Sequence, residues 1–359
     1  MINEAHITGT GVWVPPNVIT NEELVEAYNE FAHTDPERFK PSSAEFILKA
    51  SGIKQRHVID RVGILDPKRL HPYIPDRPND VQSIQCEMSV NSARGALEQA
   101  RLTGEDIDQV IAACSNFQRP YPAVAIEVQD QLGIVGAAMD VNVGCCSATF
   151  AIRMAAQSVM CGESRGTLVV VPELVTGHVN FRDRDSHFIF SDASCAIVVQ
   201  PLSTIRTPER YQITSTKSQT QFSNNIRNNF GFLARCDEAN ANNSDKLFTQ
   251  KGRGVFKEVV PMVVRHLRAH VGDELPNIKR YWLHQANSHM NKLITKMLLG
   301  HEASHEEAPT ILENYANTAA AGSIIAFHQN RQDFAVGDQG VICSFGAGYS
   351  IGSILLRRV

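Results

Sequence analysis

Two nearly all-apolar helical segments place the strongest constraint on how this chain folds. The first is CCSATFAIRMAAQSVMCG, which runs from Cys145 to Gly162 and offers only Arg153 and Gln157 as a polar stripe. A helix that is apolar on nearly every side belongs inside a protein, because none of its faces is suited to water. A second segment of this kind, NTAAAGSIIAFHQ, begins at Asn317. The fold must therefore enclose two helices.

Each of these helices follows one strand-like segment and precedes another, which indicates an internal repeat. In the first half, QVIAACSN comes before the strand and helix of 139–161, and GTLVVVPEL and FSDASCAIVVQ follow. In the second half, RYWLHQAN comes before the strand-like TILENYA and the helix, together 309–329, and GVICSF and GAGYSIGSILLRRV follow. Strands that alternate with helices of this length predict an α/β protein with a largely parallel sheet covered by helices.

The boundary between the halves is predicted near residue 202, which gives an N-terminal half 1–202 and a C-terminal half 203–359. The stretch 202–250 is polar and lacks helical apolar periodicity. It is predicted to form an edge hairpin and loops rather than a disordered linker.

Two inserts interrupt the first half, near 32–43 and at 61–80. Before them, ITGTGVWVP predicts a strand and TNEELVEAYNEF a helix, with Thr20 or Asn21 as its N-cap. The second insert holds four prolines, which exclude a regular helix or a central strand. Both inserts are predicted to be surface loops, and loops of this length often shape a neighbouring site.

Length and charge exclude several classes of protein. The chain has 359 residues, 43% hydrophobic and 20% charged, which is enough for two fused halves around a large core. No apolar run approaches the roughly 20 residues that cross a bilayer, and MINEAHITGTG lacks the features of a secretion signal. The net charge of -4 argues against a globally basic nucleic-acid-binding protein. We therefore expect a cytoplasmic enzyme that binds neither membrane nor nucleic acid.

The eight cysteines divide into two groups. They contain no CxxC pair and no zinc-ligand spacing, so no metal site is expected. Cys145 and Cys146 lie where a strand ends and a helix begins, and the amides and dipole of a helix start lower the pKa of a thiol there. The other six are predicted to be buried, reduced and packed as small apolar residues: Cys86, Cys114, Cys161, Cys195, Cys236 and Cys343.

Partners for a nucleophilic thiol are present in the second half. Acyl chemistry needs a base or proton donor, a second polar group and N–H donors for a developing oxyanion. His284 ends an apolar strand, and Asn317 opens the second buried helix. The small-residue turn in SFGAGYSIGS can bring main-chain N–H groups close to a substrate. Taken singly, these features also fit a core histidine, a helix cap and a tight hairpin; together with Cys145 they predict an active site at the strand ends.

These residues, in this order, resemble the β-ketoacyl-acyl carrier protein synthase III group of the condensing enzymes, within the thiolase superfamily. The resemblance covers nearly the whole chain outside the two inserts. It implies a thiolase-like fold of two similar α/β halves related by pseudo-twofold symmetry, with a five-layered α-β-α-β-α core, in a homodimer. It rests on TGTGVWVPPNVITNEEL, GIKQRHV, DVNVGCCSATFA, FSDASCAIVV, HQAN, ANTAAAGS and FGAGYSIGS.

The resemblance also implies a reaction. The family nucleophile stands five residues after the Asp of the DV strand, which selects Cys145 and leaves Cys146 to packing. An acyl thioester such as acyl-CoA would acylate Cys145, with the N–H groups of Cys145 and Ala347 as the oxyanion hole. Malonyl-acyl carrier protein would then lose CO2, and His284 and Asn317 would stabilise the enolate that attacks the acyl group. The thioesters are substrates, and no cofactor is implied.

Further residues are implied to bind substrate or carrier protein. Asn287 would hold the pantetheine arm, Phe46 would lie against the CoA adenine, and Tyr121 would close the acyl pocket of the partner subunit. Gly348 lies in the turn that lines the site, and Ala50 replaces a common Arg, which puts ordinary CoA recognition in question. The residues expected to face the acidic carrier protein are Lys257, Lys296 and His289, of which His289 replaces a basic residue.

Three alternatives stay open at this point. The departures at Ala50 and His289 fit an acyltransferase or a non-decarboxylating condensing enzyme of the same superfamily. Cys, His and Asn also serve cysteine hydrolases, so a thioesterase is a second alternative. A scaffold that binds carrier protein without catalysis is the third, although such a protein would be expected to have lost Cys145, His284 or Asn317.

Overall fold

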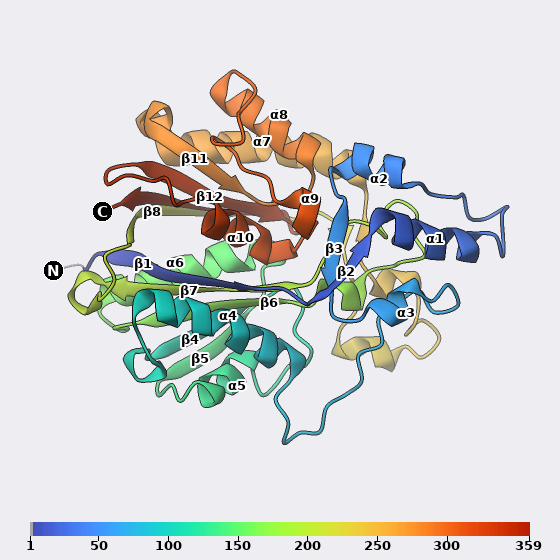
Figure 1. Ribbon diagram of the computed structural model, residues 1–359, viewed down its shortest axis with the longest axis horizontal. Coiled ribbons are helices and arrows are strands. Elements are labelled where there is room, and N and C mark those ends of the chain that lie inside the picture. Colours follow the sequence, from blue (N-terminus) through green and yellow to red (C-terminus); the bar gives the residue numbers. More distant parts are fainter. Residues whose placement is uncertain (1–2) are drawn as a thin grey trace.

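The computed structural model describes residues 3–359, which form one large mixed sheet with helices inside and outside it (Figure 1). Nine strands make up this sheet: β1 (Ala5–Trp13), β4 (Gln109–Ala113), β5 (Ala137–Val141), β6 (Thr167–Glu173), β7 (Ala193–Pro201), β8 (Tyr211–Thr220), β11 (Ile278–Leu283), β12 (Gln339–Gly346) and β13 (Ser350–Arg358). Their order across the sheet is β11-β12-β13-β8-β1-β7-β6-β4-β5. Two small ribbons pair β2 (Asn17–Thr20) with β3 (Gln55–Val58) and β9 (Ile226–Arg227) with β10 (Thr249–Gln250).

Most of the helices form three layers that alternate with the two parts of the sheet. The helices are α1 (Asn21–Ala32), α2 (Ala44–Ser51), α3 (Arg61–Leu65), α4 (Ile84–Ala100), α5 (Val124–Gln131), α6 (Ser147–Cys161), α7 (Gly252–Val271), α8 (Ser288–Leu299), α9 (Leu312–Tyr315) and α10 (Gly322–Gln329). The middle layer is α6, which contacts β4, β6 and β7 as well as β12 and β13, together with α10, which contacts β1, β11 and β12. The outer layers are α4 and α5 on one side and α7 and α8 on the other (Figure 1). This is the five-layered α-β-α-β-α order that the resemblance implies. The prediction of a largely parallel sheet is wrong, because β1, β7, β8 and β13 join the sheet by antiparallel pairing.

Small side chains allow the two central helices to be enclosed. On α6, Ala148, Ala151 and Ala155 are fully buried, and on α10 Ile324 and Ile325 are fully buried. Alanine lets strands from both halves approach a helix closely, and each buried aliphatic side chain adds about 1.5–3 kcal/mol of transfer free energy. The burial predicted from the missing polar face is confirmed.

Two expectations about the second half are wrong. TILENYA was expected to be a strand, but it contains the short helix α9, because Leu312 and Ala316 pack on Ile53 and one helical turn closes between them. The stretch that begins at 202 was expected to form an edge hairpin, but β8 lies inside the sheet, where it pairs antiparallel with both β13 and β1. Because β1 pairs with β8, the sheet is continuous across residue 202, and the division into 1–202 and 203–359 stays a prediction.

The predictions for the N-terminal region hold better. Helix α1 begins after Thr20, whose hydroxyl accepts from the Glu23 N–H while the Glu23 carboxylate accepts from the Thr20 N–H, a capping box. The insert at 32–43 joins α1 to α2. The insert at 61–80 was predicted to lack a regular helix, but it begins with the short helix α3, which ends before the first of the four prolines, and beyond α3 it has no further helix or strand. Of the six cysteines expected to be buried, Cys161 and Cys236 are exposed, because one ends α6 at the surface and the other lies in a surface loop.

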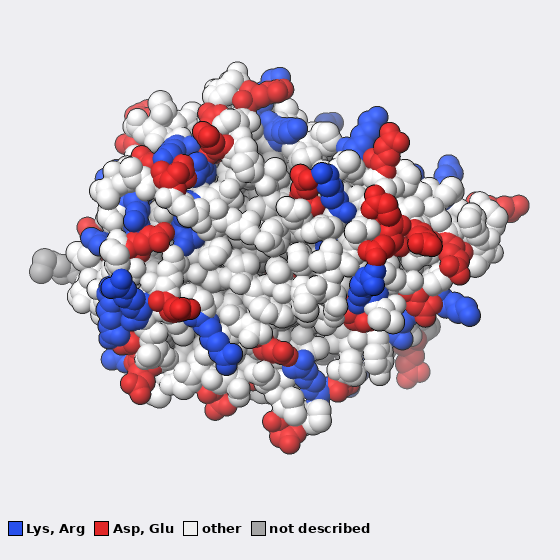
Figure 2. Space-filling view, in the orientation of Figure 1, with Lys and Arg blue, Asp and Glu red and all other residues white. Residues whose placement is uncertain are grey.

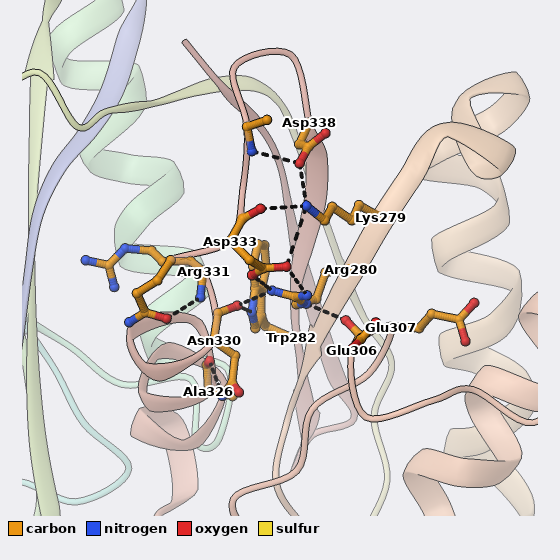
Figure 3. Close-up of polar contacts among 12 residues, drawn as sticks. Lys279, Arg280, Trp282, Glu306, Glu307, Ala326, Asn330, Arg331, Asp333 and Asp338 are labelled. Atoms are coloured by element: carbon orange, nitrogen blue, oxygen red, sulfur yellow. Dashed lines mark hydrogen bonds and ion pairs between the residues drawn. The ribbon is translucent and has the colours of Figure 1, made fainter.

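A polar cluster connects β11 with the segment that follows α10 (Figure 3). Arg280 on β11 is 4% exposed; its guanidinium donates to the Asp333 carboxylate at 2.6 and 2.8 Å and to the Asn330 carbonyl at 2.8 Å. The indole N–H of Trp282 donates to the same carbonyl at 2.9 Å. Since Asn330 directly follows α10, this cluster joins β11 to the end of the buried helix.

Charged side chains lie mainly around the rim of the face in Figure 2 and leave a largely uncharged centre. Acidic side chains gather where α1 lies, and its Glu22, Glu26 and Glu30 are exposed. Within residues 3–359, no helix combines the length and apolar composition needed to span a membrane.

Candidate active site

Cys145 lies where two cavities meet, at the carboxyl end of β5 and just before α6. Each cavity has a volume of about 520 Å³. The outer cavity is lined by Cys145 together with Phe46, His284, Asn287 and Asn317. The three predicted catalytic residues, Cys145, His284 and Asn317, therefore line one cavity, although as many as 172 positions separate them in the chain.

The sulfur of Cys145 lies among backbone groups of its own turn and of the turn after β12. The N–H groups of Ala347 and of Cys145 itself lie close enough to the sulfur to lower its pKa. Gly346 passes so close that a Cβ atom there would lie 2.9 Å from the sulfur, and Gly144 has a φ of +55°. Glycine is therefore required at both positions, by space at one and by backbone conformation at the other.

The expected lowering of the thiol pKa is wrong. Burial, and after it the negative charge of Glu173, raises the pKa of Cys145 to about 12, and the two backbone N–H groups only partly oppose this. Helix α6 begins at Ser147, so Cys145 lies outside its first turn, where the helix dipole acts most strongly. Cys146, by contrast, is fully buried and donates to the Ser350 carbonyl at 3.1 Å, as packing predicts.

His284 follows β11 directly and is held as a neutral imidazole. His284 is 2% exposed, and its main-chain N–H donates to the Cys343 carbonyl at 2.8 Å. The imidazole ring lies edge-on to the Phe345 ring, with the ring centres 5.3 Å apart. Burial lowers the pKa of His284 to about 4, opposed by the backbone carbonyl of Ala319. At neutral pH the ring therefore offers a hydrogen-bond donor without a positive charge.

Asn317 is fixed by the backbone on both sides. Asn317 is 5% exposed. Its main-chain N–H donates to the Ile189 carbonyl at 3.0 Å, and its main-chain carbonyl accepts from the Ser191 N–H at 3.1 Å. Its side-chain oxygen accepts from the Ala319 N–H at 2.9 Å. The NH2 group is thus the part of the Asn317 side chain that can donate to a bound molecule.

Glu173, at the end of β6, is a candidate residue that sequence reasoning missed. It is fully buried, and burial raises its pKa to about 7, although hydrogen bonds from Ser115, Ala320 and Cys114 oppose the shift. The signal was present, because Glu173 is the single charged residue in the apolar strand GTLVVVPEL.

A second residue that was missed, Arg184, lies against Phe46, which lines the outer cavity. Its guanidinium lies 4.1 Å from the centre of the Phe46 ring. Asn287 caps α8, and its NH2 group donates to the Ala50 carbonyl at 2.7 Å. Ala50 also lines this cavity, so a stacked guanidinium and aromatic ring are present close to the position where the family's Arg is replaced.

The other residues predicted to bind substrate lie apart from this group. Gly348 is exposed and lines the inner cavity beside Ala347. Tyr121 is 81% exposed and lines none of the cavities described for this chain.

The residues predicted to bind the carrier protein differ in their exposure and in their contacts within the chain. Lys257 is exposed on α7, whereas Lys296 on α8 lies 3.8 Å from the Glu302 carboxylate. The ring of His289 is paired with the Lys49 carbonyl at 2.8 Å. In the described part of the chain, no three His, Cys, Asp or Glu side chains are grouped as a metal site.

The inner cavity continues from Cys145 between aromatic side chains. Its walls include Phe190, Phe222, Phe230 and Phe248. A further cavity of about 390 Å³ adjoins it and shares His178 as a wall residue. Volumes of roughly 300–1,000 Å³ are typical of sites that enclose small organic ligands.

Comparison with known proteins supplies an independent view of the chain. Residues 139–221 match a family model described as 3-oxoacyl-[acyl-carrier-protein (ACP)] synthase III, and residues 270–358 match the one for its C-terminal part. A β-ketodecanoyl-[acyl-carrier-protein] synthase of Pseudomonas aeruginosa is 52% identical over 341 residues, which are 94% of this chain and 97% of that protein. A β-ketoacyl-[acyl-carrier-protein] synthase III of Vesicomyosocius okutanii is 27% identical over 98% of both chains.

Two solved structures have the same fold. The 3-oxoacyl-[acyl-carrier-protein] synthase III of Aquifex aeolicus superposes with a TM-score of 0.76 at 24% identity, covering 98% of this chain and 99% of that one. The priming β-ketosynthase of the R1128 polyketide pathway superposes with a TM-score of 0.80 at 21% identity, covering 99% and 96%. The likeness extends over nearly the whole chain.

Proposed function

The chain belongs to the β-ketoacyl-acyl carrier protein synthase III family of condensing enzymes, and we propose that it joins a medium-chain acyl primer to a malonyl unit through an acyl group on Cys145. The observation that carries the proposal is the common cavity of Cys145, His284 and Asn317, with two backbone N–H groups on the sulfur.

In the first half reaction, the acyl carbon bonds to the sulfur of Cys145 as its bond to the thiol of the donor breaks. The thiol is neutral at rest, so its proton must leave as the thioester enters, and it ends on the departing thiol. The proton passes from the sulfur of Cys145 to the sulfur of the departing thiol, so the acylated site carries no new charge. The N–H groups of Cys145 and Ala347 are suited to stabilise the oxyanion that forms.

In the second half reaction, the malonyl carboxylate leaves as CO2, and the electron pair of the broken bond forms an enolate. Hydrogen bonds from His284 and the NH2 group of Asn317 stabilise the enolate oxygen. The enolate carbon then bonds to the acyl carbon, the bond to Cys145 breaks, and the sulfur takes up a proton from solvent. Neutral donors suit this step, because a charged imidazolium would be costly to bury at this site.

An octanoyl group is the proposed primer. The product named for the 52% identical P. aeruginosa relative has a decanoyl chain, two carbons of which come from the malonyl unit. The aromatic inner cavity of about 520 Å³ supports a chain of this class. Acyl-CoA is the proposed donor, since the pair of Arg184 and Phe46 offers a cationic and aromatic surface for a nucleotide.

The proposed partners are an acyl carrier protein and a second copy of this chain. Lys257, with Lys296, would face the acidic carrier protein at the mouth of the outer cavity. Strand β5 ends the sheet, and the neighbouring Tyr121 and Val135 are 81% and 84% exposed. An end strand with apolar neighbours favours pairing with its own copy, which would bring Tyr121 to the partner's acyl pocket.

The experiment combines purified protein, acyl-CoAs from acetyl to palmitoyl, and malonyl-acyl carrier protein labelled in its free carboxyl group. We expect labelled CO2 and a β-ketoacyl-carrier protein product, with the highest kcat/KM for octanoyl-CoA. Cys145→Ala should abolish the product, and the adjacent Cys146→Ala is the matched control that should retain it. Release of free fatty acid without CO2 would favour the thioesterase alternative and contradict the proposal.

A further inference from the structure

We propose that Glu173 is a positioning residue that holds the peptide group between Ala319 and Ala320, and through it orients His284 and Asn317 for the decarboxylation step. The inference rests on the proposed function, because it concerns the second of its two half reactions. Glu173 belongs to the first half of the chain and the two alanines to the second, so the contact also links the halves.

The carboxylate of Glu173 accepts hydrogen bonds from every polar group described around it. One oxygen accepts from the N–H of Ser115 at 3.0 Å and from the N–H of Ala320 at 3.1 Å. The other accepts from the Ser115 hydroxyl at 2.6 Å and lies 3.6 Å from the Cys114 thiol. All four partners are donors, so this environment is built for a carboxylate.

The peptide that Glu173 holds is the one that faces both catalytic candidates. Its N–H belongs to Ala320 and donates to Glu173, while its carbonyl belongs to Ala319 and interacts with the imidazole of His284. The preceding N–H, of Ala319, donates to the side-chain oxygen of Asn317 at 2.9 Å. A shift of this peptide would therefore move the partners of His284 and Asn317 together.

The backbone at Ala319 adopts a conformation that needs a stabilising contact from another part of the chain. Ala319 has a φ of +47°, a left-handed conformation that is uncommon for a residue with a side chain. Within residues 3–359, the buried Nδ1 atom of His284 makes no hydrogen bond of normal geometry. An external contact is thus needed to keep the Ala319 carbonyl facing the ring, and Glu173 supplies the one on the same peptide group.

The two halves of the reaction give this role a distinct signature. Acyl transfer to Cys145 depends on the N–H groups of Cys145 and Ala347, whereas the hydrogen bonds described for Glu173 come from Ser115, Ala320 and Cys114. Decarboxylation depends on His284 and Asn317. Loss of the Glu173 contact should therefore slow CO2 release much more than acylation, whereas a general weakening of the fold would slow both alike.

The test measures the half reactions separately, in full-length wild-type protein, Glu173→Ala and Glu173→Gln. Acylation of Cys145 by octanoyl-CoA is followed by mass spectrometry, and CO2 release from malonyl-carrier protein is followed with preformed acyl-enzyme. We expect Glu173→Ala to slow CO2 release at least tenfold. Acylation should be slowed less than threefold or become faster, because loss of the negative charge lowers the pKa of Cys145. Glu173→Gln keeps an acceptor oxygen for Ala320 and should restore CO2 release to within about threefold of wild type.

The matched control is Asp192→Asn, which alters another fully buried carboxylate whose partners are Thr176 and Ile59. It should leave the ratio of the two rates unchanged. Equal losses in both half reactions of Glu173→Ala, or unchanged CO2 release, would overturn the inference. If Glu173→Ala does not fold, Glu173→Asp applies the same criterion, because it withdraws the carboxylate by one methylene. A wild-type protein that is never acylated would instead contradict the proposed function.

Discussion

A Cβ atom added to Gly346 would lie 2.9 Å from the sulfur of Cys145 and 2.7 Å from its Cβ atom. The two residues are 201 positions apart in the chain, and their contact brings the turn after β12 against the nucleophile. We predict that Gly346→Ala slows acylation of Cys145 at least tenfold and destabilises the protein by about 1–3 kcal/mol, the usual range for overpacking.

Mass spectrometry of the acyl-enzyme and urea unfolding measure these two effects. Gly231→Ala is the control, because a Cβ atom at Gly231 meets nothing within 4 Å and its backbone is extended. A Gly346→Ala protein that is acylated at the wild-type rate would show that the turn is not held against the sulfur as described.

Glu173 should also influence the reactivity of the thiol. Its negative charge raises the pKa of Cys145, and its own pKa is about 7. Glu173→Gln removes this charge, so the pKa of Cys145 should fall and alkylation by iodoacetamide should become faster. The gain should be larger above about pH 7, where Glu173 is ionised, than below it. Equal alkylation rates of the two proteins across this range would contradict the prediction.

Acid should destabilise the protein through its buried histidines. Burial lowers the pKa of six of them to about 4: His178, His187, His266, His270, His284 and His328. Each binds a proton more weakly in the folded chain than in the unfolded chain, so stability falls as the pH drops from about 6.5 towards about 4. The raised pKa values of Glu173, Asp192 and Asp140 act in the opposite direction, but they are three groups against six.

Urea unfolding at about pH 7.5 and about pH 5 measures this effect, and we expect a loss on the order of 2–5 kcal/mol at the lower pH. An unchanged free energy of unfolding would mean that the imidazoles are not buried as neutral rings.

The Arg280 cluster should stabilise the second half. Arg280→Met leaves the carbonyl of Asn330 without its guanidinium donor and Asp333 without its main partner, and we expect a loss of about 1–3 kcal/mol in the free energy of unfolding. Lys279→Met is the control, because Lys279 is 35% exposed in its side chain and exposed ion pairs contribute only about 0–1 kcal/mol. Comparable losses in the two variants would contradict the role of burial.

The elements that could be predicted from the sequence are those whose pattern lies within one short segment. The first apolar helix, the strand before Cys145 and the cap at Thr20 are encoded in short segments, and they were predicted with nearly correct bounds. The second apolar helix was predicted to begin at Asn317 but begins at Gly322, because a 3-10 turn occupies residues 319–321. Helix α9 has four residues, too few for helical periodicity to show. Strand β8 has a polar sequence, and its place inside the sheet depends on β13, which lies more than a hundred residues later in the chain.

The candidate site shows the same limit. Its residue types and their order could be predicted, together with the family. The pKa of Cys145 could not, because burial is a tertiary property and here outweighs the local amides. Glu173 and Arg184 were missed for a similar reason, since their importance depends on Ala320 and Phe46, residues distant in the sequence.

The most direct test of the account is to locate the acyl group. The protein is incubated with octanoyl-CoA, digested, and the peptide that contains Cys145 and Cys146 is fragmented in the mass spectrometer. The account predicts one octanoyl group on Cys145, which disappears when malonyl-acyl carrier protein is added, with release of CO2 and a β-ketodecanoyl product. An octanoyl group on Cys146, or a group on Cys145 that leaves only as free octanoate, would contradict it.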